Sequence, residues 1–381
     1  MKSFTLILVE TGLQLNIPDL KRVSSATFPM WGNFFFLDFC LGNFQTEHPV
    51  RRILVLEGEH RGIQSFIHST WKHEALEVVP LVNGISEFIE LLESDASELI
   101  ILAATSLVTL FGTNEIFEIM EATGQANRIK ISVNGTPSNL YLIDRKDLID
   151  LLQSFRNRYS VSDSFTEFLF NEILLSSFDQ IVNISGEILF QNNLMQLYRQ
   201  NIELVTRQRT TNCQEAMQKL SQPAAEGTPS YVGENGFIRE AFISSGVEIY
   251  GYVENSILFP GVLIKSRTKI INSVIMNNNQ IGRNTLIQNS LVLPYQREVK
   301  KGSSNIGSEV VIGGESTVTK NTQFPNQING GLTVIGLDAD IPRGTVIEQG
   351  CYLGAHVSKN RLRSLKHLKR GRSLFADERN N

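Results

Sequence analysis

The sequence is poor in cysteine and has no long apolar run. Only three cysteines occur among the 381 residues, at Cys40, Cys213 and Cys351. Their odd number and wide spacing exclude a disulfide framework and a cysteine-based metal site. No segment approaches the ~18 apolar residues of a membrane-spanning helix, and the apolar run after Met1 is too short for a signal peptide. We therefore expect a cytoplasmic protein with reduced thiols and no membrane partner.

An excess of basic residues is also missing. The formal net charge is −4 and the pI is near 6.0, so we expect no general nucleic-acid binding. The six histidines form no H-E-x-x-H motif, and His68 and His73 would not present two ligands to one metal. We therefore expect no bound metal and no cofactor. The composition is ordinary for a globular chain, and the length suggests two domains, or three at most.

What the chain does contain is a six-residue repeat between residues 243 and 353. Neither a helix, with a period of 3.6, nor a simple strand, with a period of 2, has this spacing. Three units of one short strand and one turn form a triangular coil, so the repeat predicts a parallel β-helix over residues 237–358. An ordinary β-sandwich with chance spacing is the alternative, and the recurrence of whole runs disfavours it. The apolar positions are Val247, Val253, Phe259; Ile264, Ile270; Ile275, Ile281, Ile287, Leu293; Ile306, Ile312, Val318, Phe324; and Ile335, Ile341, Ile347, Leu353.

The first 206 residues alternate between strand and helix patterns. Uninterrupted apolar runs indicate buried strands at residues 4–9, 51–56, 99–103 and 139–143. One-face apolar spacing indicates helices at residues 62–73, 85–92, 114–123, 145–156, 165–175 and 194–205. The alternation predicts a doubly wound α/β domain with a mostly parallel sheet over residues 1–206. A ligand of such a sheet binds beyond the carboxyl ends of the strands.

Two further segments flank the repeat. Residues 207–236 are rich in Thr, Gln, Ser, Pro and Gly without periodicity, which is typical of a linker. Residues 359–381 form a basic carboxyl-terminal tail, in which Leu362, Leu365 and Leu368 recur every three positions and indicate a short amphipathic helix. The alternatives for this tail are a frayed end, a docking segment for a partner subunit, and a site for a membrane surface or an anion.

Two stretches resemble sugar nucleotidyltransferases, most closely the ADP-glucose pyrophosphorylase (glucose-1-phosphate adenylyltransferase) family. Pro-Met-Trp-Gly at 29–32 with Asp-Phe-Cys-Leu-Gly-Asn at 38–43 is similar to that family's P-F-G-G…R-x-x-D-F-x-L-S-N segment. Val-Glu-Asn-Ser-Ile-Leu-Phe-Pro-Gly-Val at 253–262 with Asn-Ser-Val-Ile-Met at 272–276 is similar to its V-E-N-S-V-L-F-x-G-V…N-S-V-I-M segment. The resemblance implies an α/β plus β fold, with a nucleotidyltransferase-like domain followed by a left-handed parallel β-helix of hexapeptide repeats.

The chemistry implied by the resemblance is attack of a sugar phosphate on the α-phosphate of ATP, with Mg²⁺ held by carboxylates. The residues that this reaction needs are missing. One glycine, Gly12, stands after the first strand where the family has a Gly-rich loop, and Glu10 would repel a triphosphate. Residues 104–106 (Ala-Thr-Ser) replace the family's metal carboxylate, and Phe35 replaces its Arg. We therefore expect neither a catalytic residue nor a metal ligand.

Four positions remain as weak, vestigial substrate-binding candidates: Gly32, Asp38, Asn43 and Lys130. Lys130 is the nearest basic residue to the family's sugar-phosphate lysine. Asp38 is expected to brace a helix start rather than to bind a ligand. His356 lies where a hexapeptide acyltransferase could place a catalytic base, and a structural or solvated histidine is the favoured interpretation.

The resemblance and these losses predict a degenerate member of the family. We expect a regulatory or structural subunit in glycogen biosynthesis, as a homo-oligomer or as a hetero-oligomer with an active pyrophosphorylase homologue. One alternative is an active adenylyltransferase with a diverged site, which would use Mg²⁺ as a cofactor. The other is a non-catalytic sensor of a sugar phosphate or nucleotide.

Overall fold

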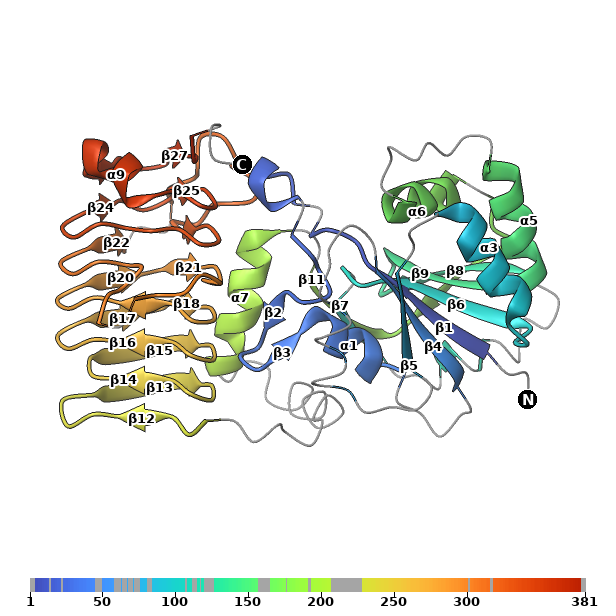
Figure 1. The fold of residues 1–381 in the computed structure, drawn as a ribbon, viewed down its shortest axis with the longest axis horizontal. Helices are drawn as coiled ribbons and strands as arrows, with labels where there is room; N and C mark the ends of the chain where they lie inside the picture. Colours follow the sequence, from blue (N-terminus) through green and yellow to red (C-terminus); the bar gives the residue numbers. More distant parts are fainter. Residues whose placement is uncertain are drawn as a thin grey trace.

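The computed structural model consists of an α/β domain and a β-helix with helix α7 between them (Figure 1). It describes residues 4–377 except 14, 22, 45–49, 58–62, 64–66, 68–70, 72–75, 81–83, 107, 112–114, 117, 120–126, 157–164, 176, 191–192, 207–227, 301 and 316–317. Among the helices so described, none is long and apolar enough to cross a bilayer.

The α/β domain is built on a seven-stranded sheet with the order β10-β8-β9-β6-β1-β4-β5. Neighbouring strands β6, β1, β4 and β5 run parallel, and β9 alone runs antiparallel to both of its neighbours. This arrangement confirms the predicted, mostly parallel sheet. The strands are β1 (Phe4–Val9), β4 (Val50–Glu57), β5 (Leu76–Pro80), β6 (Leu99–Ala104), β8 (Arg128–Val133), β9 (Thr136–Asp144) and β10 (Gln180–Ile184).

Helices cover both faces of this sheet. On one face, α3 (Ile85–Ser94), α5 (Arg145–Phe155) and α6 (Phe165–Leu175) share a core with alternate residues of β1 and β6. The other face packs against α1 (Phe36–Gly42). The helices expected at 85–92, 145–156, 165–175 and 194–205 are confirmed, whereas those at 62–73 and 114–123 lie largely outside the described residues.

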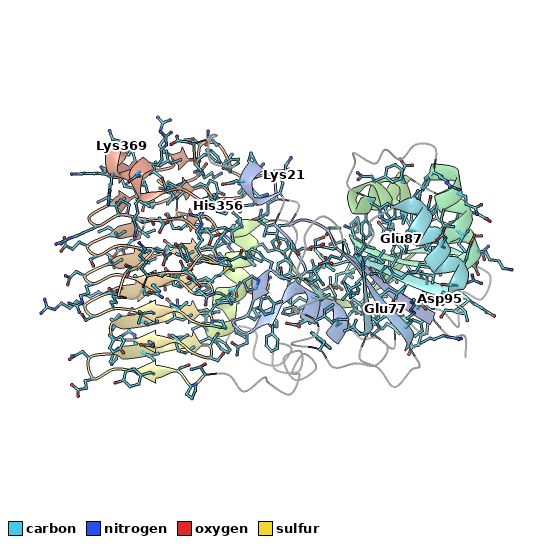
Figure 2. The ribbon with its side chains drawn as sticks, in the orientation of Figure 1. Lys21, Glu77, Glu87, Asp95, His356 and Lys369 are labelled. Atoms are coloured by element: carbon cyan, nitrogen blue, oxygen red, sulfur yellow. The ribbon has the colours of Figure 1, made fainter. Side chains whose placement is uncertain are left out.

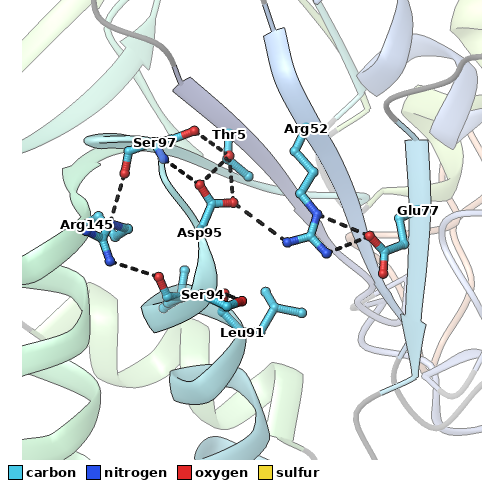
Figure 3. A network of polar contacts seen from close by, with 9 residues as sticks. Thr5, Arg52, Glu77, Leu91, Ser94, Asp95, Ser97 and Arg145 are labelled. Atoms are coloured by element: carbon cyan, nitrogen blue, oxygen red, sulfur yellow. Dashed lines mark hydrogen bonds and ion pairs between the residues drawn. The ribbon is translucent and has the colours of Figure 1, made fainter.

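A buried carboxylate holds the amino-terminal end of β1. Asp95, which follows α3, accepts hydrogen bonds from the Thr5 hydroxyl (3.0 and 3.1 Å) and from the Ser97 backbone N–H (2.7 Å) (Figure 3). Arg52 approaches the same carboxylate at 3.9 Å and binds Glu77 at 2.6 Å. Because ligands of parallel sheets bind at the opposite, carboxyl end of the strands, this network is a structural tie between α3 and the sheet.

The second domain is the predicted parallel β-helix. Every described strand pair in it is parallel, and most of the predicted repeat positions stack into one core along the axis of the coils. Four of those positions do not: Phe259, Leu293 and Phe324 pack in the core shared with the first domain, and Val318 is 83% exposed. The first face contains β12 (Tyr231–Val232), β14 (Glu248–Ile249), β16 (Leu263–Ile264) and β19 (Gln280–Ile281). The remaining strands are β13 (Phe237–Ile243), β15 (Tyr252–Leu258), β17 (Lys269–Ile271), β18 (Val274–Ile275), β20 (Leu286–Gln288), β21 (Ser290–Val292), β22 (Val311–Gly313), β23 (Thr333–Ile335), β24 (Val346–Ile347), β25 (Tyr352–Leu353), β26 (His367–Leu368) and β27 (Ser373–Leu374).

The β-helix is longer than the sequence predicted at both ends. At its start, strand β12 lies inside the segment expected to be a linker, residues 207–236, and pairs with β14 of the β-helix. At its end, β26 and β27 extend the ladders of β24 and β25 into the segment expected to be a tail, residues 359–381. The expected tail helix exists as α9 (Lys359–Leu365), but Leu368 belongs to a strand rather than to that helix. The many Lys and Arg residues of this segment favoured an exposed tail, although Leu362 and Leu368 are buried.

One apolar core joins the two domains. It combines Trp31 and Phe36 from the first domain with outward-facing residues of the β-helix such as Ile257 and Tyr352. Helix α7 (Leu194–Val205) lies in this junction with β2 (Pro29–Met30), β3 (Phe34–Phe35), β7 (Val108–Phe111), β11 (Gly186–Phe190) and the short helix η1 (Pro18–Leu20). The continuous core makes the two domains one packed unit.

Candidate functional site

The carboxyl end of the central strands holds a buried polar cluster, formed by the hydroxyls of Ser25 and Thr105 and the backbone of Thr11. Thr11 follows β1, and Thr105 follows β6. The Ser25 hydroxyl lies 2.8 Å from Thr105 Oγ1 and donates to the Thr11 carbonyl at 2.5 Å. Thr105 Oγ1 also accepts from the Thr11 backbone N–H at 3.3 Å. All three residues are fully buried, so they fill the edge where a parallel sheet ordinarily binds its ligand.

The loop after β1 folds back on itself rather than outward. Gly12 forms an antiparallel bridge with Ser24, and Leu13 donates its N–H to the Val23 carbonyl at 3.1 Å. A Cβ on Gly12 would stand 2.2 Å from the Lys21 carbonyl oxygen. The glycine that the sequence presents as the remnant of a phosphate loop therefore allows a close approach of two backbone segments.

Glu10 is buried beside this loop. Its carboxylate accepts a hydrogen bond from the Ser24 hydroxyl, and its backbone N–H donates to Leu56 at 3.1 Å. The Ser24 hydrogen bond therefore engages the carboxylate of Glu10 within the protein. Among the described residues, no group of three His, Cys, Asp or Glu side chains is arranged to hold one. The donor set at this edge does not fit Mg²⁺, which prefers carboxylates and open water positions.

Gly32 lies at the junction of the two domains. Its φ of +77° is in the region that favours glycine, and a Cβ would stand 2.6 Å from both Phe242 Cε1 and Ser244 Oγ of the β-helix. The neighbouring Trp31 donates its backbone N–H to Asn201 Oδ1 at 3.0 Å and its indole N–H to the Gln200 carbonyl at 3.2 Å. The segment that resembles a substrate loop is thus packed against α7 and the β-helix.

Asp38 braces the start of α1. One carboxylate oxygen accepts the Phe35 backbone N–H at 2.7 Å, and the other accepts the Trp71 indole N–H at 2.6 Å. The residue is only 4% exposed, and burial raises the pKa of Asp38 to about 6 despite these two hydrogen bonds. This geometry agrees with the bracing role expected from the sequence, and both oxygens are engaged within the protein.

Asn43 caps the end of α1, and Lys130 lies on β8. The Asn43 amide donates to the Thr109 carbonyl at 2.6 Å and accepts from Phe111 N–H at 3.3 Å, which ties the end of α1 to β7. Lys130 lies in the middle of β8, away from the carboxyl edge, with its ammonium 5.9 Å from the centre of the Phe178 ring. A ligand-binding role for Gly32, Asp38, Asn43 and Lys130 stays a prediction, and the structure does not bring all four together.

Sequence reasoning missed the residue that ties η1 to the last coils of the β-helix. Asp19 accepts the Tyr352 hydroxyl at 2.8 Å and the Ala355 backbone N–H at 2.6 Å. Burial and this neighbouring carboxylate raise the pKa of Tyr352 well above its ordinary value. No periodic pattern links residues more than 300 positions apart, so only the Pro-Asp pair of a short helix start could have drawn attention to Asp19.

His356 lies on the β-helix (Figure 2), where it has polar partners. Its Nδ1 lies 3.1 Å from Arg297 Nη2 and 3.6 Å from Asp338 Oδ2. Asp338 also accepts the Gln296 backbone N–H at 2.5 Å, which holds the loop between β21 and β22 against the next coil. His356 is half-exposed with structural partners, in keeping with the interpretation favoured from the sequence.

Comparison with protein families locates the repeat independently. The model described as "GlmU-like, C-terminal hexapeptide" matches residues 223–335. This match covers most of the β-helix and includes β12, so it supports a coil that begins before residue 237.

Curated relatives match longer parts of the chain. A glucose-1-phosphate adenylyltransferase of Acetivibrio thermocellus is 27% identical over 173 residues, or 44% of this chain and 37% of the relative. A protein of the same name from Fervidobacterium nodosum is 30% identical over 41% of this chain and 34% of the relative. One from Bacillus cereus is 24% identical over 66% of this chain and 63% of the relative. The chain therefore covers less than two thirds of the length of each of these relatives, and only about a third of the first two.

Proposed function

Because the chain belongs to the ADP-glucose pyrophosphorylase family, we propose that it is a non-catalytic, regulatory or structural subunit of glycogen biosynthesis. It would associate with a catalytically active homologue, and its first domain would be a nucleotidyltransferase-like scaffold without turnover. The buried polar cluster of the Ser25 and Thr105 hydroxyls with the Thr11 backbone is the observation that carries this proposal.

Nucleotidyl transfer places negative charge on phosphate oxygens in the transition state. Catalysis needs free backbone N–H groups, cationic side chains and a metal held by carboxylates at the same point. Here the N–H groups of Thr11 and Leu13 donate within the protein, and hydroxyls stand at Thr105 and Ser106 where a carboxylate would be needed. Loss of one such donor alone typically reduces a rate by about 10²–10³.

The first coil of the β-helix offers the surface for association. In later coils the core residues, such as Val253 and Leu258, are fully buried, whereas Ile238 and Ile243 of the first coil are only partly buried. Around this end Tyr231, Val232, Phe237 and Tyr250 are all at least 36% exposed. Strands β12 and β13 pair on one side only among the described strands, and such edges accept a further strand.

Reconstitution tests the proposal. The purified chain is mixed with an active glucose-1-phosphate adenylyltransferase, and mass is measured by light scattering together with the rate of ADP-glucose synthesis. The proposal predicts a mixed oligomer with altered kinetics, and Phe237→Lys should weaken it. Ile181→Lys, at an equally apolar position that is 72% exposed on edge strand β10, is the matched control. Two separate, unmodified species would overturn the subunit role.

The enzyme alternative makes the opposite prediction for the chain alone. A diverged but active site would form ATP from ADP-glucose, pyrophosphate and Mg²⁺ without a partner. The sensor alternative predicts that ATP, glucose 1-phosphate or ADP-glucose raises the melting temperature of the isolated chain.

A further inference from the structure

The carboxyl-terminal end of the β-helix carries a dense group of cations, here called the basic cap. Residues 359–372 contain seven of the 35 Lys and Arg residues and none of the 39 Asp and Glu residues. These cations are Lys359, Arg361, Arg363, Lys366, Lys369, Arg370 and Arg372. The chain as a whole is acidic, so the cap is a local inversion of charge rather than part of a general trend.

The basic cap is part of the folded coil. Leu362 of α9 is fully buried in the β-helix core, and the Ser358 hydroxyl accepts the Arg361 N–H at 3.4 Å to start the helix. Lys366 ends α9 in the left-handed region, with φ of 47°, and donates its N–H to the Leu362 carbonyl at 2.8 Å. The cations are therefore held on a rigid surface, at the end of the β-helix marked by Lys369 in Figure 2.

The acidic residues near the cap are already engaged. Glu348 has one oxygen 2.7 Å from His367 Nε2 and accepts the Arg370 backbone N–H at 2.9 Å with the other. Asp377 lies 3.3 Å from Arg361. Within the described part of the chain, no carboxylate pairs with Arg363, Lys366 or Lys369, all of which are exposed. Like charges held together at a surface attract an anionic partner.

The form of the cap favours one class of partner. The exposed cations are spread over α9 and the last coil instead of converging on a buried point, which suits an extended anionic chain better than a small phosphate. Leu365, 43% exposed among them, adds an apolar contact. An amphipathic helix that binds a membrane inserts its apolar face, but Leu362 on α9 is committed to the β-helix core. We propose that the basic cap is a docking surface for an acidic polypeptide segment of a partner protein.

A binding assay with the full chain tests this inference. The probe is a short fluorescein-labelled peptide of glutamates with one central leucine, measured by anisotropy at physiological salt. Binding of phosphatidylglycerol vesicles and of a single-stranded oligonucleotide is measured in parallel, as the alternative anionic partners. Arg363→Glu with Lys369→Glu should weaken peptide binding about tenfold or more, since two exposed charge pairs become repulsive. Lys146→Glu on α5 with Arg156→Glu at the carboxyl-terminal cap of α5 changes the net charge equally and should leave binding unchanged.

A second variant separates a protein partner from a general polyanion. Leu365→Ser keeps every charge and should weaken binding of the leucine-containing peptide but not of an all-glutamate peptide. The inference is overturned if the peptide does not bind, if vesicles or the oligonucleotide bind in its place, or if the α5 control weakens binding to the same extent. These readouts are independent of any assay of ADP-glucose synthesis.

Discussion

Protonation of Asp38 should stabilise the fold at mildly acidic pH. The unfolded carboxyl titrates near 3.8, and burial raises the folded pKa to about 6. A group whose folded pKa is raised binds its proton more tightly in the native state. Its contribution to stability is fully present below the unfolded pKa and is lost as pH rises through about 6. One pKa unit corresponds to ~1.4 kcal/mol, so the gain from about pH 7.5 to about pH 4.5 is ~2 kcal/mol.

The measurement compares the native protein with Asp38→Asn. Urea unfolding, followed by tryptophan fluorescence, gives the free energy of unfolding at both pH values. The amide of the variant cannot titrate. On acidification the free energy of unfolding of the unsubstituted protein should therefore rise by ~2 kcal/mol relative to that of the variant. Asp150→Asn, on the exposed side of α5, controls for removal of one surface carboxyl. A difference that does not change with pH would contradict the raised pKa of Asp38, because it would mean that the Trp71 and Phe35 hydrogen bonds keep the carboxyl ionised.

Three further substitutions test the junction of the domains. Gly32→Ala should lower the free energy of unfolding in denaturant by ~2–3 kcal/mol, because residue 32 has a positive φ and a Cβ there would clash with the β-helix. The control Gly135→Ala should cost only ~1 kcal/mol, because residue 135 has a similar φ but a Cβ there would meet no atom within 4 Å. Asp19→Ala should cost ~1–3 kcal/mol, because it removes two hydrogen bonds to the last coils, and hydrogen exchange should accelerate at Ala355. Asn201→Ala should cost ~1–3 kcal/mol by leaving the Trp31 N–H unpaired, and an unchanged melting curve would contradict the proposed packing.

Much of the fold could be predicted because it depends on repeating patterns. An uninterrupted apolar run predicted strand β1, and the six-residue period predicted the β-helix. Both patterns correspond to observed elements. Strand β10 was missed because it is an exposed edge, where Ile181 is 72% exposed and the polar Gln180 and Asn183 interrupt the apolar residues. The last coil was missed because cations on its surface outnumber the leucines of its core.

The candidate site was less accessible to sequence reasoning. The single glycine after β1 and the Ala-Thr-Ser sequence at residues 104–106 are read directly from the sequence, since each is a simple residue pattern. The buried polar cluster could not be predicted, because Thr11, Ser25 and Thr105 come from three separate segments and carry no common motif. The contact of Gly32 with Phe242 has the same cause, as it depends on how the two domains meet.

The sheet edge where a ligand would bind is filled by the hydroxyls of Ser25 and Thr105 and the backbone of Thr11. The most direct test is pyrophosphorolysis, in which the purified chain is incubated alone with ADP-glucose, pyrophosphate and Mg²⁺ and the ATP formed is measured. We expect no ATP above the blank at any protein concentration. ATP formation that scales with the chain, and that is lost on replacing Thr105 by a bulky residue at the same edge, would contradict it.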